Sequence, residues 1–501
     1  MSNWPLYHLQ LYLLSLIKQL AGDTIIYGIG QIVPRVLHLI VLTTYLTNRL
    51  VHRTDYAAYV DLYAYTAVLI VLFSYRMDTA LFRFGKNKDD LPKVYGTAMA
   101  PIFLSGVAVV LLGFSFSDLI ATWLTYPDNA YYIEWFCLII AFDVVNLIPF
   151  AKLRLESRAK LFVLYKLLNV ILTIILVLLL IETDLLDFII RFFPNATSDI
   201  DYVFLSNLIA SAFTFCLLLI FHFPRQIKVD LQLWRKMALY GAPLVIVGVA
   251  ANINQYFAVP LQKYFLGAET LANKDQAAVY GAVQKIAGLL GLFTAAFNYA
   301  AEPFFFRNSD RSDARDLYGQ IALYFVIFAS IASVTIYGLL DIFQLVIGAQ
   351  FRENLFLIPI LLISYMFLGL YYNVSIWYKL SDQTIYGAII STIGTIITVG
   401  ASVALLPIFG VSSSAWISLL CYLTMVLLAW TIGKKKYSIN YPVGRISAYL
   451  ITTALILTLC WIVQTMTPAP LLYGGVILLT YCGAIWWLEK DRLIALIKES
   501  V

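Results

Sequence analysis

The sequence predicts an all-α integral membrane protein, and two observations carry this prediction. Of the 501 residues, 61% are hydrophobic and only 13% are charged, whereas a soluble domain carries about 25% charged residues. The apolar residues form continuous runs of the length that a helix needs to cross a bilayer, about 20 residues. Continuous runs differ from the short alternating segments of a transmembrane β-barrel. Lipid is therefore the expected solvent, and helices are the expected spanning elements.

The positions of the apolar runs predict about fourteen spans joined by short connections. A further amphipathic stretch, residues 9–20, predicts a short helix that lies in the membrane interface before the first span. The predicted spans are 24–46, 56–76, 95–116, 131–150, 161–181, 202–221, 237–259, 277–300, 317–339, 355–377, 384–406, 412–432, 446–465 and 471–488.

The distribution of lysine and arginine predicts the orientation of these spans. With the N-terminus in the cytoplasm, 25 of the 34 basic residues fall on the inner side and 6 on the outer side. Basic residues are retained in the cytoplasm. The distribution therefore predicts a multi-pass protein with both termini in the cytoplasm. The basic residues then serve as topology signals and require no nucleic-acid partner.

The two halves of the chain share a weak repeat. Tyr27-Gly28 recurs as Tyr240-Gly241, and Leu81–Phe84 resembles Phe304–Arg307. Six spans separate the copies, so both have the same orientation, and parallel repeats of this kind place substrate sites between them. Chance similarity of apolar sequence is the alternative. The repeat predicts four parts: an interfacial helix at 1–21, an N-lobe of spans 1–6 at 22–225, a C-lobe of spans 7–12 at 226–433, and spans 13–14 with a cytoplasmic tail at 434–501.

Three basic residues, Arg35, Lys166 and Lys285, lie within predicted spans. A charge at the bilayer centre costs about 2.5–3.5 kcal/mol on insertion scales, so each should face protein or water. Arg35 continues a polar stripe that begins at Gln31, and Pro34 beside it is expected to kink the span. Two interpretations stay open for Arg35, a cavity-facing cation or one half of a structural ion pair. Lys166 is near enough to the cytoplasmic end to reach the interface instead.

Other polar residues within the spans have two interpretations each. Asp143 and Asp61 are membrane carboxylates that would balance a cavity cation, bind a coupling ion or carry a proton, and solvation is the alternative for Asp61 near the outer edge. Asn252 and Gln255 belong to a polar group in span 7 that would line a cavity or form hydrogen bonds between helices.

The cations together predict an anionic substrate. Phosphate or pyrophosphate needs charge-assisted donors once it leaves water, and arginine grips it with two parallel bonds while lysine acts as a point charge. Arg83, Arg154 and Arg307 at cytoplasmic span ends predict an entrance for anionic headgroups, with plain topology signalling as the alternative. The four histidines have no metal-ligand spacing, and we expect neither a metal nor a cofactor.

Several segments together resemble the polysaccharide transporter family of lipid-linked oligosaccharide flippases, within the superfamily of multidrug and oligosaccharidyl-lipid exporters. The resemblance runs from about Leu20 to Tyr441. The segments that carry it are Leu20–Thr24 with Tyr27-Gly28, Tyr75–Phe84, Asp143 with Pro149–Glu156, Val279-Tyr280 with Lys285–Ala287, Glu302–Phe304, Tyr371–Leu380 and Tyr386–Ala388.

The resemblance implies two six-helix lobes around a central cavity plus two extra C-terminal helices. It also implies alternating access and an undecaprenyl-pyrophosphate-linked oligosaccharide as cargo, carried to the outer leaflet for O-antigen, capsule or exopolysaccharide synthesis. A coupling proton or sodium ion, a polymerase and glycosyltransferases are the expected partners. The alternative is a cation-coupled multidrug antiporter of the same superfamily. An enzyme is not expected, because the longest outer segments, around 182–201 and 260–276, are too short for a catalytic domain.

Overall fold

A computed structural model describes residues 30, 32–50, 52–85, 90–156, 158–183, 191–222, 228–309, 313–381 and 383–500 of the chain. For 299, 300, 303, 307 and 491–500 it describes the backbone only. The interfacial helix predicted for 1–21 and the predicted site residue Gln31 lie outside the described residues. Throughout the described ranges the regular structure is helical, without a strand.

Thirteen helices in this part of the chain are long and apolar enough to cross a membrane. They correspond one by one to the predicted spans 2–14. The first predicted span begins before the described residues and continues as the π-helix η1 (His38–Leu42) and the helix α2 (Thr43–Arg49). The prediction of an all-α membrane protein is therefore confirmed.

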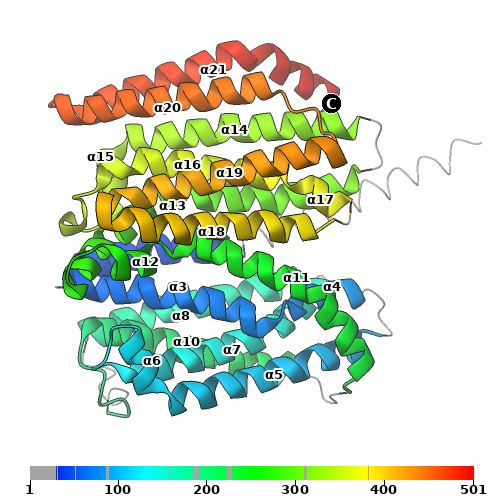
Figure 1. Cartoon of the computed structure of the whole chain (residues 1–501), viewed down its shortest axis with the longest axis vertical. Coiled ribbons are helices and arrows are strands. Elements are labelled where there is room, and N and C mark those ends of the chain that lie inside the picture. Colours follow the sequence, from blue (N-terminus) through cyan, green and yellow to red (C-terminus); the bar gives the residue numbers. More distant parts are fainter. Residues whose placement is uncertain are drawn as a thin grey trace, which may run out of the picture. The chain divides into compact units, whose positions relative to one another are not determined.

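The chain forms two compact units (Figure 1). Unit 1 contains residues up to Leu42 and Asp61–Asn252, and unit 2 contains Thr43–Val60 and Ile253–Val501. The division into two six-helix lobes stays a prediction. The helices with residues in unit 1 are α3 (Arg53–Ser74), α4 (Met77–Phe84), α5 (Leu91–Ser115), α6 (Ser117–Trp123), α7 (Ala130–Leu155), α8 (Ala159–Glu182), α10 (Asp199–His222) and α11 (Leu231–Tyr256).

Unit 2 takes α2, the first residues of α3, the last residues of α11 and all later helices. Its remaining helices are α12 (Ala258–Phe265), α13 (Thr270–Arg307), α14 (Ala314–Gly338), α15 (Leu340–Phe343), α16 (Ile358–Val374), α17 (Ile376–Leu380), α18 (Ile385–Phe409), α19 (Ser412–Lys436), α20 (Val443–Met466) and α21 (Pro470–Ser500). Three short 3₁₀ turns, η3 (Gln344–Val346), η4 (Ala349–Phe351) and η5 (Leu355–Leu357), connect α15 to α16.

The core of unit 1 lies where α4, α5 and α7 pack together. Met77 and Leu81 of α4, Met99 of α5 and Val144 of α7 are buried in one cluster. Figure 1 shows α5, α7 and α10 side by side, with α7 between the other two. Burial of these apolar faces leaves the opposite faces of α5 and α8 for lipid, as the many exposed leucines and isoleucines there require.

The chain breaks sharply between α3 and α4. Tyr75 and Arg76 have φ angles of 48° and 54°, a left-handed conformation that costs a non-glycine residue about 1–3 kcal/mol. Gly241 of α11 approaches this break so closely that a Cβ there would lie 2.5 Å from the Tyr75 carbonyl oxygen. The matching helix of the predicted repeat, α13, runs without a break for 38 residues, so the two copies differ at this point.

The connection between η1 and α3 is anchored within unit 2. The Thr47 hydroxyl accepts a hydrogen bond from the Gly348 amide at 2.9 Å. Arg53 pairs with Asp275 at 2.9 Å and with Glu353 at 2.7 Å. These contacts tie the start of α3 to α13 and to the 3₁₀ turns before α16.

The last two helices, α20 and α21, pack on α14, as Figure 1 shows. Glu489 of α21 is 3% exposed; it accepts hydrogen bonds from Arg445 at 2.6 Å and from Tyr449 at 2.6 Å. A Cβ on Gly474 would lie 1.8 Å from the Gly338 carbonyl oxygen, so α14 and α21 cross at backbone distance. Small residues at such crossings are typical of membrane helices.

Replacing Gly474 by alanine is expected to lower thermal stability, because the added methyl group collides with the α14 backbone and overpacking costs about 1–3 kcal/mol. Gly475→Ala is the matched control: its Cβ would meet no atom within 4 Å, and alanine favours helix by about 1 kcal/mol over glycine. Tryptophan-fluorescence melting of the detergent-solubilised protein measures both. Equal midpoints for the two variants would contradict the close crossing.

Candidate functional site

A group of charged side chains lies inside unit 1, where α7, α8 and α10 pack on one another. The Asp143 carboxylate of α7 interacts with the Lys166 ammonium of α8 and with the Ser211 hydroxyl of α10. Lys166 in turn interacts with the Arg35 guanidinium. Lys166 therefore lies within electrostatic range of both Asp143 and Arg35, and these three charges, all predicted within the membrane, come from three helical segments. We call Arg35, Asp143 and Lys166 the unit 1 charge cluster.

Helical spacing extends this cluster into polar stripes. On α8, Lys166, Asn169 and Thr173 are three and four residues apart, which places them on one face of the helix. On α10, Ser211 and Thr214 share a face in the same way. Asn169 donates a hydrogen bond to the Thr214 hydroxyl at 3.0 Å, so the two stripes meet. Such bonds between helices are the usual partners of polar side chains in a bilayer.

The unit 1 charge cluster contains two cations and one anion. Arg35 is exposed and forms neither a hydrogen bond nor an ion pair with any residue that the structure describes. The Lys166 ammonium lies 4.3 Å from the centroid of the Phe150 ring, a cation–π contact. Asp143 therefore neutralises only part of the positive charge, and the cluster can accept an additional anion.

A tyrosine and a histidine lie beside the unit 1 charge cluster. Tyr63 of α3 lies within electrostatic range of Asp143, and its ring centroid is 6.5 Å from that of His38. His38 begins the π-helix η1, and π-helical turns within α-helices occur frequently at functional sites. The π-helix also changes the spacing after Arg35, so the α-helical stripe that begins at Gln31 does not continue unaltered. Tyr63 and Ser211 were not predicted as site residues, because no motif distinguishes them from other polar residues of the spans.

The third predicted cation, Lys285, lies in unit 2 on α13. It is partly buried and has no hydrogen bond, ion pair or ring contact with the residues described here. Gly288, one turn further along the same face, has open space where a Cβ would be, with no atom within 4 Å. Gly281 packs instead against Val259, 3.2 Å from its would-be Cβ. Lys285 is thus an unpaired cation on an open stretch of α13.

Uncharged donors and acceptors surround this part of α13. Gln284 donates to the Gln255 carbonyl oxygen at 3.3 Å and interacts with the Tyr365 hydroxyl, which lies near Tyr256. The Tyr422 hydroxyl donates to the Asn254 carbonyl oxygen at 3.2 Å. These two bonds end on main-chain oxygens of α11. The Asn254 side chain also forms hydrogen bonds to α18, donating to the Ser391 carbonyl oxygen at 3.3 Å and accepting from the Thr398 hydroxyl at 3.2 Å.

Two further predicted site residues, Asp61 and Asn252, form hydrogen bonds within unit 1. Asp61 is 0% exposed and accepts a hydrogen bond from the Tyr126 hydroxyl at 3.0 Å, so the alternative of a solvated carboxylate at the outer edge is wrong. Asn252 donates to the Ala67 carbonyl oxygen at 2.7 Å and links α11 to α3. The first bond joins α3 to the connection between α6 and α7, and the second joins two helices of unit 1.

The predicted entrance arginines lie on aromatic rings. The Arg83 guanidinium is 4.4 Å from the centroid of the Tyr240 ring, and that of Arg154 is 4.7 Å from the Phe82 ring. The side chain of Arg307 lies outside the described residues. No group of three histidine, cysteine, aspartate or glutamate side chains in the described ranges could hold a metal ion.

The comparison with known families decides the family of this chain. The family described as "Polysaccharide biosynthesis protein" matches residues 20–309, more than half of the sequence. The chain belongs to this family. This membership confirms the resemblance to the polysaccharide transporters that the sequence predicted.

Solved structures show the same fold. "Lipid II flippase MurJ, inward closed conformation" aligns over 94% of this chain and 100% of that chain, with a TM-score of 0.69 and 15% identity. "Crystal structure of MATE in the straight conformation" aligns over 86% of this chain and 96% of that chain, with a TM-score of 0.52 and 14% identity. A search of curated protein sequences finds no match. At these identities the structures establish the fold alone.

Neutralising Asp143 and Lys166 tests the cluster geometry by a double-mutant cycle. Asp143→Asn leaves two cations unbalanced, and Lys166→Gln leaves the carboxylate with less compensation, so each single variant should melt earlier. The double variant should lose less stability than the sum of the losses of the two single variants, with a coupling free energy of roughly 0.5–3 kcal/mol. Thermal unfolding of the purified protein measures the cycle. Lys160→Gln, an exposed lysine at the start of the same helix, should combine additively with Asp143→Asn; equal coupling for both lysines would refute the cluster.

Proposed function

We propose that this protein moves a pyrophosphate-linked, lipid-anchored oligosaccharide from the cytoplasmic to the outer leaflet of a bacterial cytoplasmic membrane. The observation that carries the proposal is the incomplete neutralisation of the unit 1 charge cluster, where Arg35 has no partner among the described residues. A transported pyrophosphate supplies the missing negative charge. Membership of the polysaccharide biosynthesis family supports a saccharide cargo.

The chemistry of the cluster suits a phosphate better than a cation. Arginine offers a planar fork of donors that matches phosphate oxygens, and lysine adds a point charge. Asp143 reduces the cost of holding Lys166 in the membrane. At an effective dielectric of 20, two unit charges 6 Å apart interact by about 3 kcal/mol. A cationic drug would meet that repulsion from each basic group.

Unit 2 supplies a second kind of contact. Lys285 of α13 has no ion pair with a described residue. Its neighbour in sequence, Gln284, interacts with Tyr365, which lies near Tyr256, so this part of unit 2 has uncharged donors, acceptors and flat rings. Sugars are recognised by hydrogen bonds to hydroxyl groups and by stacking on aromatic faces, and tyrosine provides both. We propose that Lys285 binds an anionic part of the cargo and that its neighbours contact the sugar.

A cation-coupled multidrug antiporter is the second candidate. The observation that favours it is Asp143, a carboxylate deep in unit 1 beside Tyr63. The two candidates differ in the sign of charge that the transported molecule carries, so they predict opposite effects of the basic residues.

Arg35→Gln and Lys285→Gln are each expected to reduce polysaccharide export at least tenfold, because removal of one charge-assisted phosphate contact costs about 1.5–3 kcal/mol. Proteoliposomes loaded with a fluorescent polyprenyl-pyrophosphate oligosaccharide, with outer-leaflet appearance as the readout, measure the effect. Lys160→Gln is the matched control and should transport normally.

The same proteoliposomes separate the two candidates. A flippase leaves the efflux of cationic dyes at the level of empty vesicles. Dye efflux that needs Asp143 and persists in Arg35→Gln and Lys285→Gln would favour the antiporter. Full oligosaccharide transport by both charge-neutralised variants would remove the basis of the flippase proposal.

A further inference from the structure

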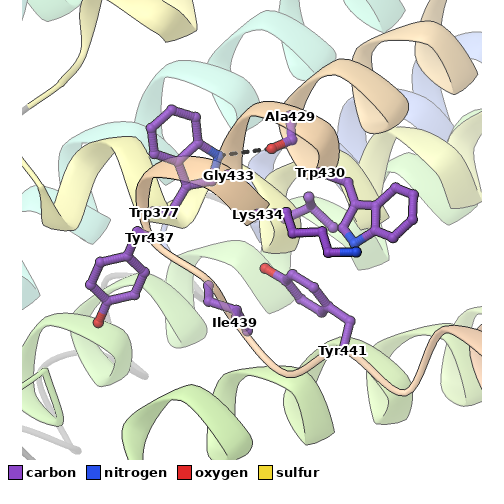
Figure 2. Close-up of a pocket in the computed structure, with 9 residues that line it drawn as sticks. Trp377, Ala429, Trp430, Gly433, Lys434, Tyr437, Ile439 and Tyr441 are labelled. Atoms are coloured by element: carbon purple, nitrogen blue, oxygen red, sulfur yellow. Dashed lines mark hydrogen bonds between the residues drawn. The ribbon is translucent and has the colours of Figure 1, made fainter.

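A small pocket lies at the C-terminal end of α19 in unit 2 (Figure 2). Its volume is about 200 Å³ when the open solvent at its mouth is included. Its wall contains Trp430 and Lys434 of α19, Trp377 of α17 and the tyrosines Tyr437 and Tyr441 that follow α19.

Fixed contacts build one side of the pocket. The Trp377 indole is buried and donates a hydrogen bond to the Ala429 carbonyl oxygen at 3.0 Å, drawn as a dashed line in Figure 2. A Cβ on Gly433 would lie 2.8 Å from the Trp377 ring, so the indole rests on the α19 backbone. The side of the pocket formed by Trp377 is therefore rigid.

Two hydrogen-bond donors on α19 face the pocket without an acceptor. Figure 2 shows the Lys434 ammonium beside the nitrogen edge of the Trp430 indole, 5.9 Å from the ring centroid. Neither Lys434 nor the Trp430 ring nitrogen has a hydrogen bond to a described residue. By contrast, Lys379 in the same unit pairs with Glu302 at 2.8 Å. The pocket thus has donors and positive charge but no carboxylate in its lining.

An apolar stripe on α19 leads to these donors. Trp416, Leu420 and Leu427 are 57%, 49% and 48% exposed, and their spacing of four and seven residues continues at Trp430 and Lys434 on the same helical face. The ten residues from Leu420 to Trp430 span about 15 Å, half of the roughly 30 Å hydrocarbon core. The acyl chains of a lipid in one leaflet therefore fit along this face, with the lipid headgroup at Lys434.

We propose that this pocket binds the phosphate of an anionic phospholipid, with the acyl chains along the stripe. The Lys434 ammonium and the Trp430 N–H donate to the phosphate oxygens. Tryptophan and lysine are typical anchors at the membrane interface, and basic pockets between spanning helices bind anionic headgroups. The site is separate from the cations proposed to bind the cargo and does not depend on that proposal.

Native mass spectrometry of the full chain in detergent tests the site with phosphatidylglycerol as the probe. Lys434→Gln is expected to weaken binding about tenfold, and Trp430→Phe, which keeps the ring and removes the N–H, should weaken it several-fold. Lys435→Gln makes the same charge change outside the pocket and should alter binding less than twofold. Phosphatidylcholine should bind wild type and Lys434→Gln alike.

Each other outcome overturns the proposal. Equal losses in Lys434→Gln and Lys435→Gln would mean that overall surface charge attracts the lipid. Displacement of phosphatidylglycerol by an equal concentration of glycerol phosphate would mean that the pocket recognises free phosphate without a lipid. A thermal midpoint of Lys434→Gln equal to wild type excludes misfolding as the cause of lost binding, and a lower midpoint would contradict the absence of partners at Lys434.

Discussion

The cost of placing charge in hydrocarbon governs the organisation of unit 1. Arg35 and Lys166 each carry an expense of about 2.5–3.5 kcal/mol at the bilayer centre, and Asp143 offsets only part of it. The Phe150 ring also stabilises the Lys166 ammonium, the Ser211 hydroxyl stabilises the Asp143 carboxylate, and Arg35 is exposed. Three helices converge on this cluster although their remaining faces are apolar. A protein that needed only a stable fold would gain by replacing these charges with hydrophobic residues, so the cluster indicates a role in binding.

A second constraint acts on the backbone, because each peptide group in a bilayer needs an internal partner. Helices satisfy it, and the described spans are helices accordingly. Two segments of unit 1 depart from regular α-helix. One is the π-helix that begins at His38, three residues after Arg35, and the other is the left-handed pair Tyr75–Arg76 between α3 and α4. Gly241 lets the α11 backbone cover the second break. Both departures lie in unit 1, and the first is directly beside its charge cluster.

The sequence predicted the elements whose signal is local and missed those that depend on packing. The spans from α3 to α21 follow from runs of apolar residues, and Arg35, Asp143 and Lys166 stand out because charge is rare within such runs. Their proximity to one another, the part played by Tyr63 and the burial of Asp61 against Tyr126 depend on contacts between distant segments. The break at Tyr75–Arg76 contains neither glycine nor proline, so the sequence has no local signal that predicts it. Runs of apolar residues therefore predicted the helices, whereas tertiary contacts determined which polar residues lie close together.

The uneven distribution of charge between the units bears on what the protein carries. In unit 1 a carboxylate lies in range of Lys166, which also lies in range of Arg35, whereas Lys285 of unit 2 has no ion pair with a described residue. A small cation attracted to Asp143 would compete with Lys166 for the same carboxylate. An anion with a neutral, hydroxyl-rich portion matches both environments, because phosphate oxygens need the basic groups and sugar hydroxyls need the uncharged ones. The proposed cargo combines a diphosphate with a sugar and so carries groups of both kinds, whereas a purely cationic or purely apolar substrate carries neither.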